Sequence, residues 1–416
     1  MSYLKPYQIL LFFILLFISF YIFTPILSAK YATIDDWLML SSEKGRAIKV
    51  FSVKNVLNTF KSSHEGLYHP IITISYSLEK TIFGLVPEIL HFDNIIFHLI
   101  NSFLTFLIFL KLSNSFWLSF IITALFAVHP TRVEVVAWIS ARKDLLYTLF
   151  YLLSILFYVN TYNSKKIKTC IFLSLLCFAL ACFSKAMAIT LPVILFLIDL
   201  YKNNFDKKKI KIYLIYLLIA LIFIIVALIV HYSRDYKNIF FTSFNFVVYF
   251  INAHFNILFY LDKLLLPIKL YCMYPFFYDT LSMPPAFILY SPTVLYLLIF
   301  FSFLSLKKTK VVFYGFLFFL ISILPASNIF PIGNFAVADR YTYIPYIGLF
   351  FIFAKLILYI CNKTNKKINL LVIILCIIIF GWLCYLSYNR TIDWKNDSYG
   401  APISMKYYEF GIKKNY

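Results

Sequence analysis

The sequence predicts an all-α integral membrane protein, a polytopic bundle of about 11–13 transmembrane helices. Of its 416 residues, 62% are hydrophobic and only 13% are charged, which is too apolar for one soluble core. The apolar runs are also about 20 residues long, the length that a helix needs to cross a bilayer. Because lipid offers no partner to the backbone polar groups, helices that pair these groups internally are the expected spanning element.

Apolar stretches place the expected helices along the chain. They lie near residues 7–27, 93–112, 115–130, 145–161, 169–184, 187–201, 211–231, 287–306, 311–325, 343–361 and 368–388. Region 245–281 is less regular and is expected to hold a further helix plus a re-entrant or interfacial piece. We expect one transmembrane domain over 1–388, with 28–92 as first external loop and start of the second helix, and a short external tail over 389–416.

The charge is unevenly placed. The net charge of +20 resides largely in short basic connectors between apolar runs, around residues 165–168, 202–211, 307–310 and 363–367. Such connectors are typical of the cytoplasmic face, so anionic membrane lipid is the expected partner and nucleic acid is not. Counting crossings from a cytoplasmic N-terminus puts residues 28–92, 129–144 and 326–342 outside. The seven cysteines show no metal or disulfide spacing.

An acidic pair follows the first predicted helix. Asp35 and Asp36, in "YATIDDWLML", stand at the external interface. Adjacent carboxylates there are suited to act as a general base or to hold a hard cation. The alternative is an ordinary solvated acid pair.

The second predicted helix carries a polar stripe. In "HFDNIIFHLINSFL", the stripe residues recur at steps of three and four, so they share one face, which must look into the bundle or a wet cavity. Hydrogen bonding between helices is the preferred interpretation over direct catalysis. The stripe consists of His91, Asn94, His98 and Asn101.

Three further clusters collect charge on the same predicted face. In "TRVEVVAWISARKD", read as a short interfacial helix, Glu134, Trp138 and Arg142 recur every four residues, and Arg142 and Lys143 are suited to bind phosphate. Headgroup anchoring is the alternative. Lys185 interrupts two apolar helices and needs an anion, either a phosphate headgroup or a distant carboxylate such as Asp144. The last cluster, in "FAVADRYTYIP", contains Asp339, Arg340 and Tyr341. Together they predict a polyanionic headgroup site.

These motifs resemble a known group. "IDDW", "HFDNIIFHLINSFL", "HPTRVEVVAWISARKDLLYTLFYLLSI", "FSKAMAITLPVILFLIDLY" and "FAVADRYTYIPYIGLF" are similar, over roughly residues 30–395, to bacterial relatives of the transmembrane-and-tetratricopeptide O-mannosyltransferases, of the GT-C class. Family members usually continue into tetratricopeptide repeats, the natural place to hold a protein acceptor. This sequence ends where such repeats would begin.

The resemblance implies a polyprenyl-phosphate-linked sugar donor and catalysis on the extracytoplasmic face, which is that of the plasma membrane if the protein is bacterial or archaeal. Asp36, or else Asp35, would be the base that activates an acceptor hydroxyl, while Arg142, Lys143, Lys185 and Arg340 would meet the donor phosphate. The acceptor (protein, lipid or glycan) and the sugar stay open. Some GT-C enzymes use a divalent metal, but the ligands are too few to predict a site. A lipid-linked-substrate flippase or transporter, or a polysaccharide polymerase or ligase, is the alternative function.

Overall fold

The computed structural model describes residues 4–32, 36, 40, 48–61, 68–232, 246–272, 274, 286–329 and 336–396. Within these ranges the chain is almost entirely helical, and the β-contact that it contains is a bridge between Tyr274 and Val337. The helices are α1 (Pro6–Phe23), α3 (Val53–Thr59), α4 (Pro70–Phe83), α5 (Pro87–Ser113), α6 (Phe116–Val128), α7 (Val133–Ala137), α8 (Arg142–Asn160), α9 (Ile167–Ser184), α10 (Leu191–Tyr201), α11 (Ile210–Tyr232), α13 (Phe246–Leu265), α14 (Ala286–Leu289), α15 (Ser291–Leu304), α16 (Lys310–Ile323), α17 (Tyr346–Lys363) and α18 (Lys366–Asn396).

Six of the described helical segments are long and apolar enough to cross a membrane. They contain α1, α5, α9, α11, α17 and α18, and α6 together with Pro130–Ala137 would make a seventh span with a bend of 56°. Shorter apolar helices occupy Ala186–Tyr201, Ser291–Lys307 and Lys310–Ala326. The predicted fold class, an all-α multi-pass membrane protein, is confirmed. The crossings between residues 232 and 286, on which the predicted total partly depends, fall in part outside the described residues.

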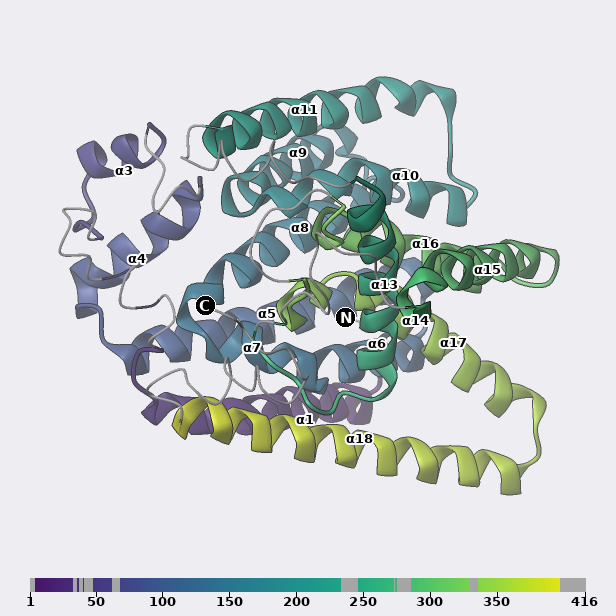
Figure 1. Ribbon diagram of the computed structural model, residues 1–416. Helices are drawn as coiled ribbons and strands as arrows, with labels where there is room; N and C mark the ends of the chain where they lie inside the picture. Colours follow the sequence, from purple (N-terminus) through teal and green to yellow (C-terminus); the bar gives the residue numbers. More distant parts are fainter. Residues whose placement is uncertain are drawn as a thin grey trace.

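The helix ends gather at two opposite ends of the bundle (Figure 1). α3 and α4 lie at one end, on the left of the view, whereas the α10–α11, α15–α16 and α17–α18 turns lie at the other, on the right. These three turns carry basic connectors, among them Lys307, Lys308 and Lys363. The ribbon thus agrees with the prediction that the basic connectors share one membrane face.

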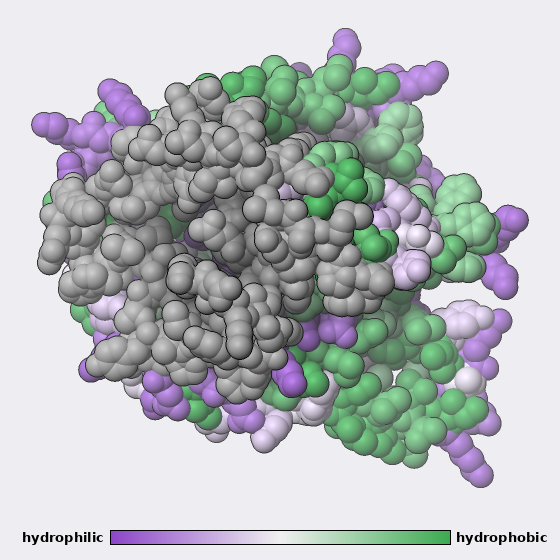
Figure 2. Space-filling model, viewed as in Figure 1, coloured by the Kyte–Doolittle hydropathy of each residue, from purple (hydrophilic) through white to green (hydrophobic). Residues whose placement is uncertain are grey.

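The flanks of the bundle are hydrophobic. Figure 2 shows hydrophobic side chains over α11 and along the α17–α18 edge, with hydrophilic side chains at the protruding tips. On α18, Leu371, Ile377 and Ile378 each expose more than 60% of their surface. A continuous apolar face of this size suits lipid and not water.

The connection between α6 and α8 lies inside the bundle and is not a single helix. It consists of a 3-10 turn over Pro130–Arg132, α7, an extended Trp138 (φ −84°, ψ 117°) and a second 3-10 turn over Ile139–Ala141. The prediction of a short interfacial helix here is wrong. The break at Trp138 separates Glu134 from Arg142, so the recurrence of Glu134, Trp138 and Arg142 every four residues does not put them on one helix face. Both charges are tolerated at depth because other segments supply partners for them.

Two boundaries also differ from those expected. The segment 28–92 holds α3, α4 and the first turn of α5, so it is not a simple loop over its described part. α18 continues through the expected boundary at residue 388 to Asn396, so the predicted tail begins within a helix. Proline and glycine determine where the helices near the site begin and end. Pro70 and Pro87 are the first residues of α4 and α5, and Gly84 (φ 73°) ends α4 in a conformation that favours glycine.

Candidate active site

Three cationic side chains from separate segments lie along one row of aromatic rings. The Lys143 ammonium is 5.9 Å from the centre of the Trp138 ring, and the Arg340 guanidinium is 5.2 Å from the same ring. The Tyr341 ring lies 5.0 Å from the Arg340 guanidinium and 4.9 Å from the Lys185 ammonium. We call these five residues the cation–ring row. Contacts of this kind hold a cation in place while leaving some of its N–H groups available.

Each cation of the row comes from a break in helical structure. Lys143 is in the first turn of α8, Lys185 caps the end of α9, and Arg340 belongs to a 3-10 turn over Asp339–Thr342. Breaks let side chains from distant parts of the sequence converge, because the chain changes direction there. The described residues therefore place three of the four predicted phosphate ligands together.

Lys185 and Arg340 each have a carboxylate partner of their own. The Lys185 ammonium donates to Asp144 Oδ1 at 2.5 Å. Glu134 Oε1 accepts from Arg340 Nη1 at 2.5 Å, and its Oε2 accepts from the Arg340 backbone N–H at 2.9 Å. Glu134 thus fixes both the backbone and the side chain of Arg340. Of the two anions that the sequence suggests for Lys185, a phosphate headgroup or a distant carboxylate, the structure shows the carboxylate, Asp144.

A third ion pair connects the 3-10 turn to α18. Asp339 Oδ2 accepts from Arg390 Nη2 at 2.7 Å, and its Oδ1 accepts from the Tyr274 hydroxyl at 3.1 Å. Arg390 also donates to the carbonyl of Pro130 at 2.9 Å. Burial raises the pKa of Asp339, and the Arg390 charge opposes that rise. Asp339 therefore anchors the turn that carries Arg340.

Arg142 lies apart from the row, inside the scaffold. Its guanidinium is fully buried and donates to Asn94 Oδ1 at 3.0 Å, to the Leu90 carbonyl at 2.9 Å and to Glu79. Its centre is 4.6 Å from the Tyr76 ring. Burial raises the pKa of Glu79 to about 8, although Arg142 opposes the rise. In this arrangement Arg142 joins α4, α5 and α8, and the structure does not bring it to the predicted headgroup cluster.

The polar stripe of α5 holds the broken segment in place. The Asn94 amide donates to the carbonyls of Val136 and Trp138, each at 3.3 Å. His98 bonds to the Tyr343 hydroxyl at 2.6 Å and to the Ala127 carbonyl at 3.0 Å, and Asn101 donates to the Leu145 carbonyl at 3.0 Å. His91 is also buried, and neither of its ring nitrogens has a hydrogen-bond partner among the described residues. The contacts of Asn94, His98 and Asn101 are of the kind that the preferred interpretation of the stripe expects.

Asp36 is held against the same segment. Its Oδ1 accepts from the Ser140 backbone N–H at 2.9 Å and from the Ser140 hydroxyl at 2.5 Å, and its Oδ2 accepts from the Ala32 N–H at 3.0 Å. The side chain is fully buried. Asp35 lies outside the described residues. Ser140 stands two positions from Trp138, so this contact joins the first loop to the cation–ring row.

His69 is a neighbour of the row that the sequence alone did not single out. It precedes α4, and burial lowers its pKa to about 3, with Lys143 and Lys185 lowering it further. The only feature of the sequence that could have pointed to His69 is its position directly before Pro70, where a helix is expected to start. Its imidazole is therefore neutral at physiological pH, within electrostatic range of Lys143 and Lys185.

Two buried polar atoms at the site have no hydrogen-bond partner among the described residues. They are Trp138 Nε1, a donor, and Asp144 Oδ2, an acceptor. Buried polar groups are normally paired, so such atoms are candidates for contacts with a ligand. Within the described part of the chain, no group of three His, Cys, Asp or Glu side chains is placed to hold a metal ion.

Sequence comparison finds similarity to protein O-mannosyl-transferases. The human Protein O-mannosyl-transferase TMTC2 is 34% identical over 110 residues, which is 26% of this chain and 13% of that protein. Protein O-mannosyl-transferase F38B6.6 of Caenorhabditis elegans is 25% identical over 364 residues, or 81% of this chain and 48% of its own length. The chain therefore spans about half, or less, of the relatives that it matches. No protein-family model matches it.

A solved structure shares the fold. The oligosaccharyltransferase of Archaeoglobus fulgidus, crystallised with a tethered acceptor peptide containing the NVT sequon, superposes with a TM-score of 0.51 over 98% of this chain and 57% of its own. The identity of 14% makes this a likeness of fold alone. With the sequence similarity, it agrees with the predicted resemblance: the chain is similar in sequence to protein O-mannosyl-transferases and shares a GT-C-like membrane fold with the oligosaccharyltransferase.

Proposed function

We propose that this protein is a membrane glycosyltransferase that transfers a sugar, with mannose as the first candidate, from a polyprenyl-phosphate donor to an acceptor hydroxyl. The cation–ring row is the observation that carries the proposal. Lys143 lies at the start of α8 and Lys185 follows α9, whereas the basic connector 165–168 joins the other ends of these two helices. The positive-inside rule would therefore make the end that holds the row extracytoplasmic. In a prokaryote that end faces out from the plasma membrane.

The donor phosphate would lie on the row. Lys143, Lys185 and Arg340 supply N–H donors and positive charge, and Glu134 and Asp144 fix the direction of two of them. Negative charge grows on the phosphate as it leaves the sugar. Fixed cations near that oxygen therefore stabilise the transition state more than the bound donor.

The first-loop acid would activate the acceptor. The acceptor hydroxyl gives its proton to the carboxylate of Asp36, or of Asp35, while its oxygen forms a bond to the anomeric carbon. The bond from that carbon to the phosphate oxygen breaks, and the phosphate keeps the electron pair. One displacement of this kind inverts the anomeric configuration. Ser140 would orient Asp36 for this step through the two hydrogen bonds that it donates.

The sugar would lie between base and phosphate. Trp138 Nε1 and Asp144 Oδ2 are a buried donor and a buried acceptor next to the row, and sugar hydroxyls satisfy both kinds of group. The neutral imidazole of His69 would offer the sugar a further polar group without adding charge. The described residues therefore offer contacts for both parts of a phosphate-linked sugar.

The test is transfer by the purified protein in liposomes, with polyprenyl-phosphate mannose or glucose and hydroxyl-bearing peptide, lipid and glycan acceptors, analysed by mass spectrometry. Lys143→Gln/Lys185→Gln is expected to lose about 100-fold or more in transfer. The matched control, Lys363→Gln/Lys367→Gln at the other end of the bundle, should stay near wild type. Full activity of the first variant would overturn the proposal. Movement of donor across the liposome without transfer would instead identify a flippase.

A further inference from the structure

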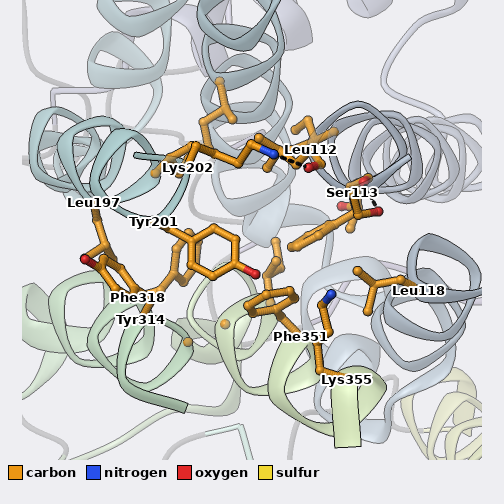
Figure 3. Close-up of a pocket in the computed structure, with 18 of the residues that line it drawn as sticks. Leu112, Ser113, Leu118, Leu197, Tyr201, Lys202, Tyr314, Phe318, Phe351 and Lys355 are labelled. Atoms are coloured by element: carbon orange, nitrogen blue, oxygen red, sulfur yellow. Dashed lines mark hydrogen bonds between the residues drawn. The ribbon is translucent and has the colours of Figure 1, made fainter. Parts of the chain in front are cut away.

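A cavity with a volume of about 280 Å³ opens between the helices (Figure 3). α5, α6, α8, α10, α16 and α17 contribute its walls, which are mostly apolar. Leu112, Ser113, Tyr201 and Lys202 lie where α5 and α10 end, so the cavity reaches the end that bears the basic connectors. It is therefore separate from the proposed transfer site.

Among the described residues, two lysines and no carboxylate line this cavity. Lys202 donates to the Leu112 carbonyl at 2.9 Å and so marks its edge. Lys355 lies deeper, because it precedes the end of α17 at Lys363 by about 12 Å of helix. Figure 3 shows its ammonium, together with the Tyr201 hydroxyl, pointing into the space between the helices.

Lys355 is the unusual member of the pair. It is half-buried, and none of the described residues forms a hydrogen bond or ion pair with its ammonium. A charge in the membrane-spanning part of a helix is costly and commonly marks a binding site or pathway. The apolar walls of the cavity suit an acyl chain, and its two lysines suit an anionic headgroup.

We propose that this cavity binds an anionic phospholipid of the cytoplasmic leaflet. Its phosphate would lie between Lys202 and Lys355, with the Tyr201 hydroxyl as a further donor, and part of one acyl chain would lie against α5 and α17. Basic pockets between transmembrane helices on the cytoplasmic side are suited to such headgroups. The surrounding charge favours the same leaflet, since Lys310 is also at this end, where it donates to Asn203 at 2.7 Å.

The lipid would also join elements that meet here. Gly315 of α16 and Gly348 of α17 line the cavity and lie so close that an added Cβ on either would fall within 2.6 Å of the other's carbonyl oxygen. A chain filling the adjoining space would add contacts to α10, α16 and α17 at once. Binding should therefore stabilise the folded protein.

The experiment is native mass spectrometry of the detergent-purified full chain with added phosphatidylglycerol, phosphatidylcholine or undecaprenyl phosphate. Phosphatidylglycerol is expected to bind at least about 10-fold more tightly than phosphatidylcholine and to raise the melting temperature. Lys355→Gln should abolish this preference and Lys355→Arg should keep it. Lys363→Gln, on the same helix but outside the cavity, is the matched control.

Three outcomes would overturn the proposal: equal binding of both phospholipids, an unchanged preference in Lys355→Gln, or displacement of phosphatidylglycerol by equimolar undecaprenyl phosphate. The last would assign the cavity to the isoprenoid carrier. If Lys355→Gln does not fold, Lys202→Gln gives the same comparison at the edge of the cavity. The readout is binding, so the result is independent of glycosyl transfer.

Discussion

Arg340 illustrates how single residues are held at the site. Its guanidinium is held by Glu134, by the Cys272 carbonyl at 3.2 Å and by two aromatic rings. A buried ion pair adds little net stability, but loss of one partner leaves an uncompensated charge at a cost of roughly 3–5 kcal/mol. The pairs at this site therefore serve mainly to fix the direction of their cations.

The role of Asp36 can be separated from that of its neighbours by substitution. Asp36→Asn is expected to reduce sugar transfer by about 1000-fold if this carboxylate is the base, because the amide cannot accept the proton. Ser140→Ala should reduce it by about 10-fold, because Asp36 loses one orienting hydrogen bond. Transfer is measured with saturating donor.

Asp35→Asn is the companion variant. If it alone abolishes transfer while Asp36→Asn lowers only the melting temperature, Asp35 is the base and Asp36 anchors the loop. Wild-type turnover in both single variants and in the double variant would rule out the first-loop base.

Lys185 is expected to act on donor affinity. Lys185→Gln removes a cation from the row, and we predict a rise in the Kd for the polyprenyl-phosphate sugar of about 10-fold or more. Asp144→Asn/Lys185→Gln removes both members of the pair and controls for the charge left behind at Asp144. Unchanged donor affinity in both variants would remove Lys185 from the phosphate site.

His69 should contribute to acid sensitivity. Its pKa is lowered to about 3 in the fold, so between pH 6.5 and 3 the unfolded chain takes up a proton that the folded chain does not. Stability is therefore lost as the pH falls through this window, by at most about 1.4 kcal/mol per pH unit. Melting temperatures of His69→Gln should depend less on pH between 6.5 and 4 than those of wild type. An unchanged slope would contradict the burial of a neutral imidazole.

The sequence supplied residue types but not their pairing. Lys185 and Arg340 stood out because charge is rare in apolar runs, and both are in the row. Arg142 stood out for the same reason, yet it is buried inside the bundle, where it forms hydrogen bonds and an ion pair with other helices. The difference lies in Glu79 and Asn94, which reach Arg142 from other helices, and no local pattern shows which helices will be neighbours.

At the scale of elements, the broken connection between α6 and α8 is the clearest departure from periodicity. The spacing of Glu134, Trp138 and Arg142 predicted one helix face. The Asn94 amide instead donates hydrogen bonds to the carbonyls of Val136 and Trp138 and so holds the end of α7 and the extended residue that follows it. Tertiary hydrogen bonds of this kind override local propensity. The long helices were predicted well because lipid requires continuous apolar runs.

The α16–α17 crossing depends on two glycines. Gly348→Ala is expected to destabilise the protein by roughly 1–3 kcal/mol, because its new methyl group would lie 2.4 Å from the Gly315 carbonyl oxygen. Gly381→Ala on α18 is the matched control, since nothing lies within 4 Å of an added Cβ there. Thermal unfolding in one detergent gives the comparison. Equal melting temperatures for the two variants would contradict the close crossing.

At the scale of the molecule, the charge count predicts which end faces the cytoplasm. Val53 of α3 is 77% exposed at the end near the site, and Lys363 lies at the other end. In intact cells an impermeant maleimide should label Val53→Cys but not Lys363→Cys, which should react only after permeabilisation. Both substitutions are made in a chain whose native cysteines are serine. Labelling of Lys363→Cys in intact cells would reverse the topology and put the proposed site on the cytoplasmic face.

The ion pair between Asp339 and Arg390 has a consequence for how the protein is made. Arg390 is near the end of α18, the last described helix, and it also donates to Pro130 beside the broken connection. Lys143 and Lys185 are synthesised before Arg340 and Arg390. The site is therefore assembled only once α18 has been inserted, so a chain truncated before Arg390 cannot present a finished site at the membrane surface.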